Sequence, residues 1–395
     1  MKVLKTLIAG LLVASAAGVA DAQTVVHLTG STAFRNATVT AITHILKPGF
    51  TYGYAGTSFT GANQAIFTGT TISNNIPIII KTSWSGSVAG VQTVSQQLPV
   101  STWLTNSTPQ STTGTPSAPS VYDPPAVPEV AMSDGVQATT PFTSPVLSAA
   151  NVGVVPFKWV RNVGSPATLA NITPNLAQAL WLNGNLPLAL FTGAPADEGT
   201  QIYAIGRDPD SGTRKTAFAE SGIGVFTAVA QYYPTNSAGA VINRANAGPI
   251  AGQKLVPTET INGIFVDVGQ GGYASGGDLA AAMKASGSQT AIGGYYVTYL
   301  GLSDATSAIS GGASEMTWNG VPFSDVAVQE GQYTFWAYEQ LDYRSNYATV
   351  DANGKAVADL IALQILYTDA VVAGELLSTM RVSRQIEGGV ISNNY

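Results

Sequence analysis

Short apolar runs alternate along this chain with segments of helical spacing, and this alternation constrains the fold more than any other feature. Ile76–Lys81 and Val152–Val160 are short and apolar, as buried strands are. Ile202–Ile205 and Gly263–Val268 are weaker strand candidates. Strands that alternate with helices predict an α/β architecture in which helices cover the faces of a sheet.

Three segments have the pattern of helices. Apolar residues recur on one face from Phe34 to Ile45, and Lys47-Pro48-Gly49 ends this helix. Asp278–Ala285 predicts a second helix, and Ala356–Ala373 predicts a longer one that is closed by a glycine. Thr105–Pro128 is rich in Ser, Thr and Pro, so we expect this segment to be a long surface loop or insertion.

The N-terminal residues have the pattern of a secretory signal peptide. Lys2 and Lys5 precede the apolar run Leu7–Val19, and Ala20-Asp21-Ala22 has the small-x-small pattern that signal peptidase accepts. The run is too short to cross a bilayer as a membrane anchor. We therefore expect cleavage after Ala22 and a periplasmic or extracellular protein.

Composition excludes several classes of function. The chain has no cysteine, which excludes disulfides, thiol nucleophiles, Cys-ligated zinc and a lipid-modified N-terminal cysteine. Charged residues make up only 10% of the chain, and the formal net charge is −6. Because Lys and Arg form no cluster, we expect no nucleic-acid partner. An anionic ligand would have to be held by backbone dipoles and one or two placed arginines.

Three short Gly/Ser/Thr turns directly precede helical patterns. They are Gly30–Phe34, Gly86–Val91 and Asp210–Thr213. A Ser or Thr at such a place caps the helix with its hydroxyl. The same geometry offers free backbone N–H groups and the positive end of the helix dipole, which together form an anion site. For one segment alone, a simple capping role is the more common explanation.

The third turn also carries arginines. Arg207 precedes it and Arg214 follows Thr213. A guanidinium offers a rigid fork of donors that matches a tetrahedral oxyanion. The alternative is a surface arginine that pairs with Asp208 or Asp210, and the spacing favours neither interpretation.

Asp134 ends an apolar, strand-like run. A carboxylate beside an anion is useful where the anion carries a proton, because the carboxylate accepts that proton in a hydrogen bond. Phosphate is protonated at neutral pH and sulfate is not, so a buried Asp134 would favour phosphate. An aspartate at a strand end is otherwise an ordinary turn or cap residue.

In this order, the segments resemble the phosphate-binding proteins of ABC phosphate importers, within the type 2 periplasmic binding-protein superfamily. The motifs that carry the resemblance are HLTGSTAFRNA (27–37), GSVAGVQ (86–92), PEVAMSD (128–134), the crossing strand VVPFKWVRN (154–162), RDPDSGT (207–213), and GGYASGGDLAAAM with TAIGGYY (271–283 and 290–296). Pro209 departs from this pattern, since the family has an acidic residue two places after the arginine.

The resemblance implies a two-lobed α/β fold with a ligand cleft between the lobes. It implies one lobe formed by residues 23–156 plus 331–395 and a second formed by residues 157–330. The ligand-binding residues that it implies are Thr32, Ala33, Phe34, Ser87, Asp134, Arg207, Ser211, Gly212 and Thr213. We expect phosphate or a similar oxyanion as ligand, a membrane ABC permease as partner, a monomer, and no cofactor or metal.

Two other functions are considered from the residues themselves. Catalysis has little support, because His27 and His44 belong to no recognisable nucleophile–base or metal constellation. An extracellular surface or adhesive protein that uses this fold to bind carbohydrate or another protein is the main alternative. The position of Trp84 bears on this alternative, since an aromatic ring in the cleft would suit a sugar, although core packing is the ordinary role of such a residue.

Overall fold

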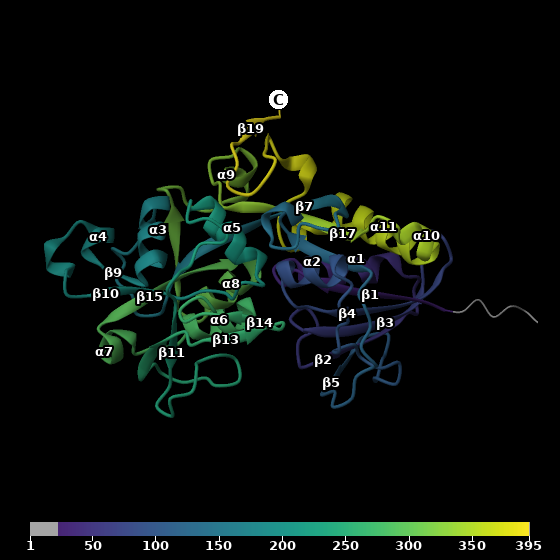
Figure 1. Cartoon of the computed structure of the whole chain (residues 1–395), viewed down its shortest axis with the longest axis horizontal. Coiled ribbons are helices and arrows are strands. Elements are labelled where there is room, and N and C mark those ends of the chain that lie inside the picture. The colour runs from purple at the N-terminus through teal and green to yellow at the C-terminus, as the bar shows by residue number, and fades with distance from the viewer. Residues whose placement is uncertain (1–22, 395) are drawn as a thin grey trace, which may run out of the picture.

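The computed structural model describes residues 23–394, and the predicted signal peptide, residues 1–22, lies outside them. The chain forms two α/β lobes that lie side by side (Figure 1). A sheet of 13 strands runs through both lobes. The prediction of a two-lobed α/β fold is therefore confirmed.

The lobe that contains the start of the described chain is built on one half of this sheet. Its strands follow the order β5-β2-β3-β4-β1-β6-β17. The bounds are β1 (Thr24–Gly30), β2 (Thr51–Ala55), β3 (Gln64–Thr70), β4 (Pro77–Ser83), β5 (Thr115–Ser117), β6 (Val130–Asp134) and β17 (Trp336–Arg344). Its helices are α1 (Arg35–Ile45), α2 (Ser87–Ser95), α10 (Tyr347–Val350) and α11 (Ala352–Tyr367), and α1 packs against α11.

The other lobe continues the sheet through β15, β10 and β9. Its strands are β8 (Asn171–Ile172), β9 (Asn185–Pro187), β10 (Gln201–Ala204), β15 (Gly294–Gly301) and β16 (Ser314–Trp318), with the hairpin strands β11 (Tyr232–Thr235), β12 (Gly252–Leu255), β13 (Glu259–Ile261) and β14 (Ile264–Val266). Its helices are α3 (Pro174–Asn183), α4 (Ala189–Thr192), α5 (Gly212–Glu220), α6 (Gly276–Met283), α7 (Ser288–Ile292), α8 (Leu302–Ser310) and α9 (Asp325–Gln329). The chain ends with β18 (Val382–Ser383) and β19 (Ser392–Asn393).

Strand β7 (Leu147–Arg161) belongs to both lobes. Its first part pairs with β17, and its last residues, from Phe157 to Arg161, pair with β15. Trp159 on this strand stacks against Trp318 and Phe335, with ring centroids 5.6 Å and 5.2 Å away. The centre of the molecule is thus an apolar cluster around a strand that both lobes share, which places the ends of β1, β6, β10 and β15 at the boundary between the lobes.

Two expectations about local structure need correction. Residues 115–117 of the Ser/Thr/Pro-rich segment form the edge strand β5, which pairs with β2, so this segment is not a loop throughout. The predicted helix 356–373 ends at Tyr367, and a 3₁₀ turn (Asp369–Val372) follows it. The helix stops because the chain turns back to the sheet, where the backbone of Glu375 bonds to Val154.

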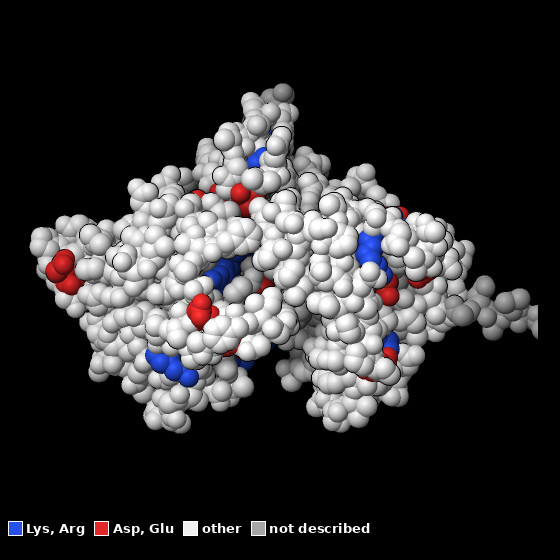
Figure 2. Space-filling model, viewed as in Figure 1, with Lys and Arg blue, Asp and Glu red and all other residues white. Residues whose placement is uncertain are grey.

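The surface agrees with the low charge of the sequence. Figure 2 shows few charged side chains on the face it presents, and a deep notch between the two lobes. Within residues 23–394, no helix combines the length and the apolar character that crossing a bilayer requires.

Candidate functional site

The three Gly/Ser/Thr turns meet where strands of the two lobes end. Gly30 closes β1 with a φ of +107°, and a Cβ at this position would lie 2.0 Å from the carbonyl oxygen of Met132. Only glycine fits there. This close approach puts the first turn beside the end of β6, which carries Asp134.

Asp134 lies in direct contact with residues of both lobes. It is 1% exposed. One carboxylate oxygen accepts a short hydrogen bond from Ser87 Oγ, and the other accepts one from Thr213 Oγ1 at 3.3 Å. A Cβ on Gly212 would lie 1.7 Å from Asp134 Oδ1, so glycine at the start of α5 is what allows this contact. The structure thus brings Ser87, Asp134, Gly212 and Thr213 together.

Arg207 is buried, at 3% exposure, and is not a surface arginine. Its Nε donates to the carbonyl of Tyr273 and its Nη2 to that of Ala274, both at 2.9 Å. Neither Asp208 nor Asp210 forms an ion pair with it within residues 23–394. The alternative of a surface ion pair is therefore wrong. Arg207 is close enough to Asp134 for its charge to lower the pKa of that carboxyl.

Ser211 caps α5, because its hydroxyl accepts a hydrogen bond from the amide of Arg214 at 3.2 Å. The amides of Gly212 and Thr213, in the first turn of this helix, have no intrahelical acceptor. Arg214 has a structural role, since its Nη1 donates to the carbonyls of Arg207 and Gln270 at 2.8 Å and 2.7 Å.

The first turn offers a second set of buried amides. Thr32 is 9% exposed and Ala33 is 6% exposed. Within the described part of the chain, the amides of these two residues have no hydrogen-bond acceptor. The amide of Phe34, in contrast, donates to Ser31 Oγ at 3.2 Å. Thr32 and Ala33 are thus the better donors of the three residues that the resemblance implies.

The lobes touch each other directly at this cluster. The amide of Val88 in α2 donates to the carbonyl of Asp210 in the opposite lobe at 3.0 Å. A Cβ on Gly301, at the end of β15, would lie 3.2 Å from Cβ of Ala33. The structure is therefore closed here, and a ligand that enters must first separate the two faces.

Sequence reasoning missed the buried charges behind Asp134. Glu339 in β17 is the cross-strand partner of Asp134, and Asp342 follows three residues later. Both are fully buried; a side-chain hydrogen bond with Ser31 lowers the pKa of Glu339, and neither carboxylate oxygen of Asp342 has a hydrogen-bond partner among the described residues. Lys215 of α5 is also buried, and its charge lowers the pKa of all three carboxyls.

Burial sets the protonation of this cluster. It raises the pKa of Asp134, while Lys215, Arg207 and the hydroxyl of Thr213 lower it. Burial and the negative charge of Asp134 raise the pKa of Glu339 well above its usual range. Burial and the neighbouring carboxyls thus disfavour the charged forms in this cluster, which reduces the repulsion that a protonated anion would meet there.

Asp342 gives a stability prediction with a defined sign. Burial raises its pKa from 3.8 to about 7. Because the folded pKa lies above the unfolded one, the stabilising effect is complete below about pH 4 and is lost as the pH rises towards 7. Over this window the Asp342 contribution to the free energy of unfolding falls by about 1.4 kcal/mol per pH unit. We expect Asp342→Asn to remove this slope in urea unfolding.

The control for this experiment is the exposed Asp267. Asp267→Asn removes the same charge, and we expect it to leave the pH dependence as in the wild type. An unchanged slope in Asp342→Asn would contradict the assignment of a buried, protonated carboxyl.

Asp208 and Asp210 flank Pro209, where the resemblance departs from its pattern. Both are buried, and burial raises their pKa values to about 6 and about 7. The amide of Asp210 donates to the Asp208 carboxylate at 3.1 Å, and Asn262 donates a short hydrogen bond to Asp210. These carboxyls shape the turn before α5 and do not pair with Arg207.

The residues considered for other functions lie elsewhere. His27 contacts Glu129 at 3.3 Å, and His44 contacts Asp369 at 2.9 Å on a half-exposed surface. No group of three or more His, Asp or Glu side chains that could hold a metal ion occurs within residues 23–394. Trp84 is 6% exposed and packs in the apolar core, as its ordinary role predicts.

No family model matches the sequence, and no curated protein matches it either. Solved structures that resemble it include a protein from Clostridium perfringens described as a phosphate ABC transporter substrate-binding protein, with bound phosphate (11% identity, 88% of this chain and 98% of that chain, TM-score 0.49). It also resembles an ABC-type phosphate transport receptor from Vibrio cholerae (11% identity, 89% of this chain and 99% of that chain, TM-score 0.47). A third similar structure is a phosphate-binding protein from Stenotrophomonas maltophilia (14% identity, 85% of this chain and 83% of that chain, TM-score 0.38).

These proteins are of the kind that the sequence motifs resemble. The ligand has to be inferred from the residues that meet at the lobe boundary.

Proposed function

We propose that this protein is a solute-binding protein that captures inorganic phosphate between its two lobes. One observation carries the proposal: a fully buried carboxyl, Asp134, is held by a hydroxyl from each lobe, Ser87 and Thr213. Two of the turns that meet here carry amides without an acceptor among the described residues, at Thr32 and Ala33 and at the start of α5. A buried acceptor among donors suits an anion that brings its own proton.

The donors come from three places. Thr32 and Ala33 offer amides from the first lobe, Ser87 offers its hydroxyl, and the first turn of α5 offers the amides of Gly212 and Thr213 with the positive end of the helix dipole. Arg207 supplies a full positive charge. Phosphate would replace the direct contact between Gly212 and Asp134, so its binding requires the lobes to part and close again.

Selectivity would follow from Asp134. As proton acceptor it stabilises a protonated oxyanion and repels a fully ionised one. We expect Asp134→Asn to reduce the preference for phosphate over sulfate by roughly tenfold or more, because the amide can donate a hydrogen bond to either ion. Competition between the two ions, followed by calorimetry, measures this ratio.

Ser87→Ala is the matched control, because it removes a donor from the same cluster but leaves the carboxylate. This variant should weaken the affinities for phosphate and for sulfate to a similar degree. If Asp134→Asn leaves the ratio unchanged, Asp134 does not accept a ligand proton.

The mechanism that fits this site is hinge closure. One lobe, residues 23–156 plus 331–395, would bind the anion first, and the other, residues 157–330, would close on it and exclude water. The segments near Val152–Phe157 and Tyr333–Glu339 would act as the hinge. As part of this proposal, a secreted protein without catalytic activity would deliver the ion to an ABC permease.

The test is calorimetric titration of the purified protein with phosphate, arsenate and sulfate, after dialysis that removes any co-purified anion. We expect phosphate and arsenate to bind and sulfate to bind far more weakly. Absence of heat with phosphate in a fully stripped, folded sample would refute the proposal. The alternative of a carbohydrate-binding surface protein has less support, since Trp84, the aromatic residue on which it rested, lies in the core.

A further inference from the structure

A large cavity lies between the lobes, beside the cluster around Asp134. Its volume is about 770 Å³, which is far more than a single phosphate ion needs, and it is lined by residues 35–36, 55–58, 60–64, 244–245, 277, 284, 303–304 and 307. The first lobe contributes the start of α1 and the loop between β2 and β3. The second contributes the N-terminal ends of α6 and α8, Lys284 and the loop around Arg244.

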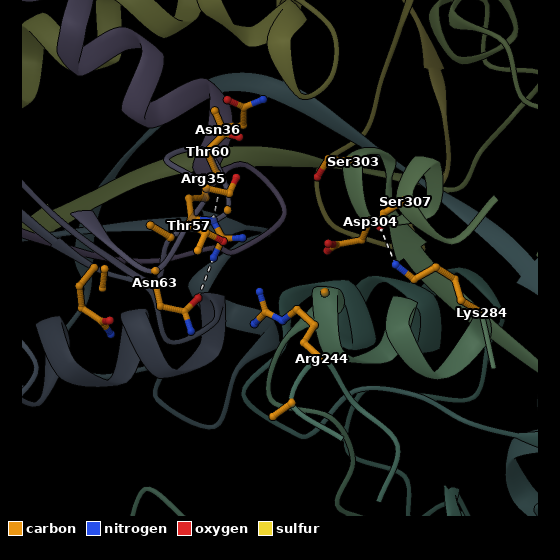
Figure 3. Close-up of a pocket in the computed structure, with 18 residues that line it drawn as sticks. Arg35, Asn36, Thr57, Thr60, Asn63, Arg244, Lys284, Ser303, Asp304 and Ser307 are labelled. Atoms are coloured by element: carbon orange, nitrogen blue, oxygen red, sulfur yellow. Dashed lines mark hydrogen bonds between the residues drawn. The ribbon is translucent and has the colours of Figure 1, made fainter. Parts of the chain in front are cut away.

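Two arginines face each other across this cavity. Figure 3 shows the guanidinium groups of Arg35 and Arg244 extending from opposite lobes towards the same space, with the Asp304 carboxylate directed into it from α8. Burial lowers the pKa of Arg35 to about 10; the negative charge of Asp304 raises this pKa, and the positive charges of Arg244 and Arg207 lower it further. Arg35 is therefore still charged at neutral pH. Bringing the lobes together thus brings two like charges together, which an anion between them would offset.

In both arginines, two guanidinium nitrogens donate to neighbouring groups and the third does not. Arg35 is 8% exposed, and its Nη1 donates to Asn63 Oδ1 at 2.8 Å while its Nε donates to the carbonyl of Thr60. Arg244 donates from Nε to Asp278 at 3.0 Å and from Nη2 to Ser275 at 3.2 Å. Nη2 of Arg35 and Nη1 of Arg244 have no partner within residues 23–394. Each is a fixed donor that is available to a ligand.

The charge and polarity of the lining residues also indicate which class of anion fits. Lys284 adds a third positive charge, and Asp304 supplies the one carboxylate of the lining. Asp278 forms an ion pair with Arg244, so the charged side chains at this cavity carry a net positive charge of about one. A phosphate monoester, which carries between one and two negative charges at neutral pH, complements this positive charge. The remaining side chains are hydroxyls and amides, with alanine and glycine, and no aromatic ring lines the cavity. This lining suits a polyhydroxylated molecule and offers nothing on which a nucleobase could stack.

We propose that this cavity binds a small phosphate monoester of a sugar or other polyol. Its phosphate would lie between Arg35 and Arg244, and Asp304 would accept hydrogen bonds from its hydroxyl groups. The inference goes beyond phosphate binding at Asp134 and does not require it. Arg35 and Arg244 line this cavity, whereas Asp134 and Arg207 do not, so each place can be tested with its own variant.

The experiment titrates the purified protein with glucose 6-phosphate and glycerol 3-phosphate, and with glucose, glycerol and gluconate as matched probes. We expect the two monoesters to bind and the neutral polyols to give no heat. Gluconate, with one charge on a carboxylate, should bind at least roughly tenfold more weakly than glucose 6-phosphate. If no monoester binds more tightly than its unphosphorylated polyol, or if gluconate binds as tightly as the ester, the inference is overturned.

Variants separate this cavity from the cluster at Asp134. Arg244→Gln should weaken the affinity for glucose 6-phosphate at least roughly tenfold and leave the affinity for inorganic phosphate within roughly twofold of the wild-type value. Its side chain is 46% exposed, so the variant should fold, which a thermal melt checks. Lys254→Gln, an exposed lysine in β12 of the same lobe, controls for the loss of one charge.

Two results would overturn the inference even if the ester binds. One is an equal loss of inorganic phosphate binding in Arg244→Gln, and the other is ester binding that depends on Arg207 but not on Arg244. Ester binding in a protein that fails to bind inorganic phosphate would instead refute the proposed function alone and support the cavity as an independent site.

Discussion

Replacing Arg207 with alanine is expected to weaken phosphate binding by at least about 100-fold, or about 3 kcal/mol. The guanidinium is the one full positive charge among the residues assigned to the ligand, and it is 3% exposed. Two of its nitrogens are fixed on the carbonyls of Tyr273 and Ala274, so the group is held in place before the ligand arrives. Charge-assisted hydrogen bonds from such a preorganised arginine are among the strongest available to an oxyanion.

Calorimetry with phosphate measures this effect. Arg207→Lys is the informative companion, because it retains the charge and loses the planar fork, and we expect an intermediate affinity. Lys254→Gln controls for net charge, and circular dichroism checks that Arg207→Ala is folded. Wild-type affinity in a folded Arg207→Ala protein would show that the ligand lies elsewhere.

Replacing Arg384 with alanine is expected to cost about 3–5 kcal/mol of the free energy of unfolding. The Arg384 side chain is 2% exposed and forms a short ion pair with Glu220 at the end of α5. It also donates to the carbonyls of Thr334 and Trp336 and lies 3.7 Å above the Trp336 ring. The substitution leaves Glu220 buried without its counter-charge, although burial already raises its pKa to about 7.

Urea unfolding at neutral pH measures the loss. Lys254→Ala changes an exposed basic residue in β12, and we expect an effect within about 0.5 kcal/mol. The double variant Arg384→Ala with Glu220→Gln should recover much of the stability, because no unpaired charge remains. A single and a double variant of equal stability would show that packing against Trp336, and not the buried charge, is what matters.

The parts of the site that could be predicted from the sequence are those with a local cause. Ser211 caps α5 through the amide of Arg214, three residues later, so this property depends on residues within one turn. The strand that ends at Asp134 was recognisable from its apolar run for the same reason. The family resemblance then supplied the order in which these turns would meet.

The parts that were missed have partners far away in the chain. Glu339 lies beside Asp134 only because β17 pairs with β6 in a register that no local pattern reveals. Lys215 follows Ser211 by four residues, which places both on one face of α5, so its helical spacing was a signal that could have been used. The strand β5 and the early end of α11 likewise depend on pairing with β2 and with Val154.

The α/β class, the three Gly/Ser/Thr turns before helices and the few placed charges can be predicted from the residues alone, because capping and periodicity act over a few residues. The burial of Arg207 beside Asp134 and the opposition of Arg35 and Arg244 across the cavity become visible in the folded chain. Such contacts join residues from opposite lobes, and their geometry follows from strand register and lobe closure, which are properties of the whole chain.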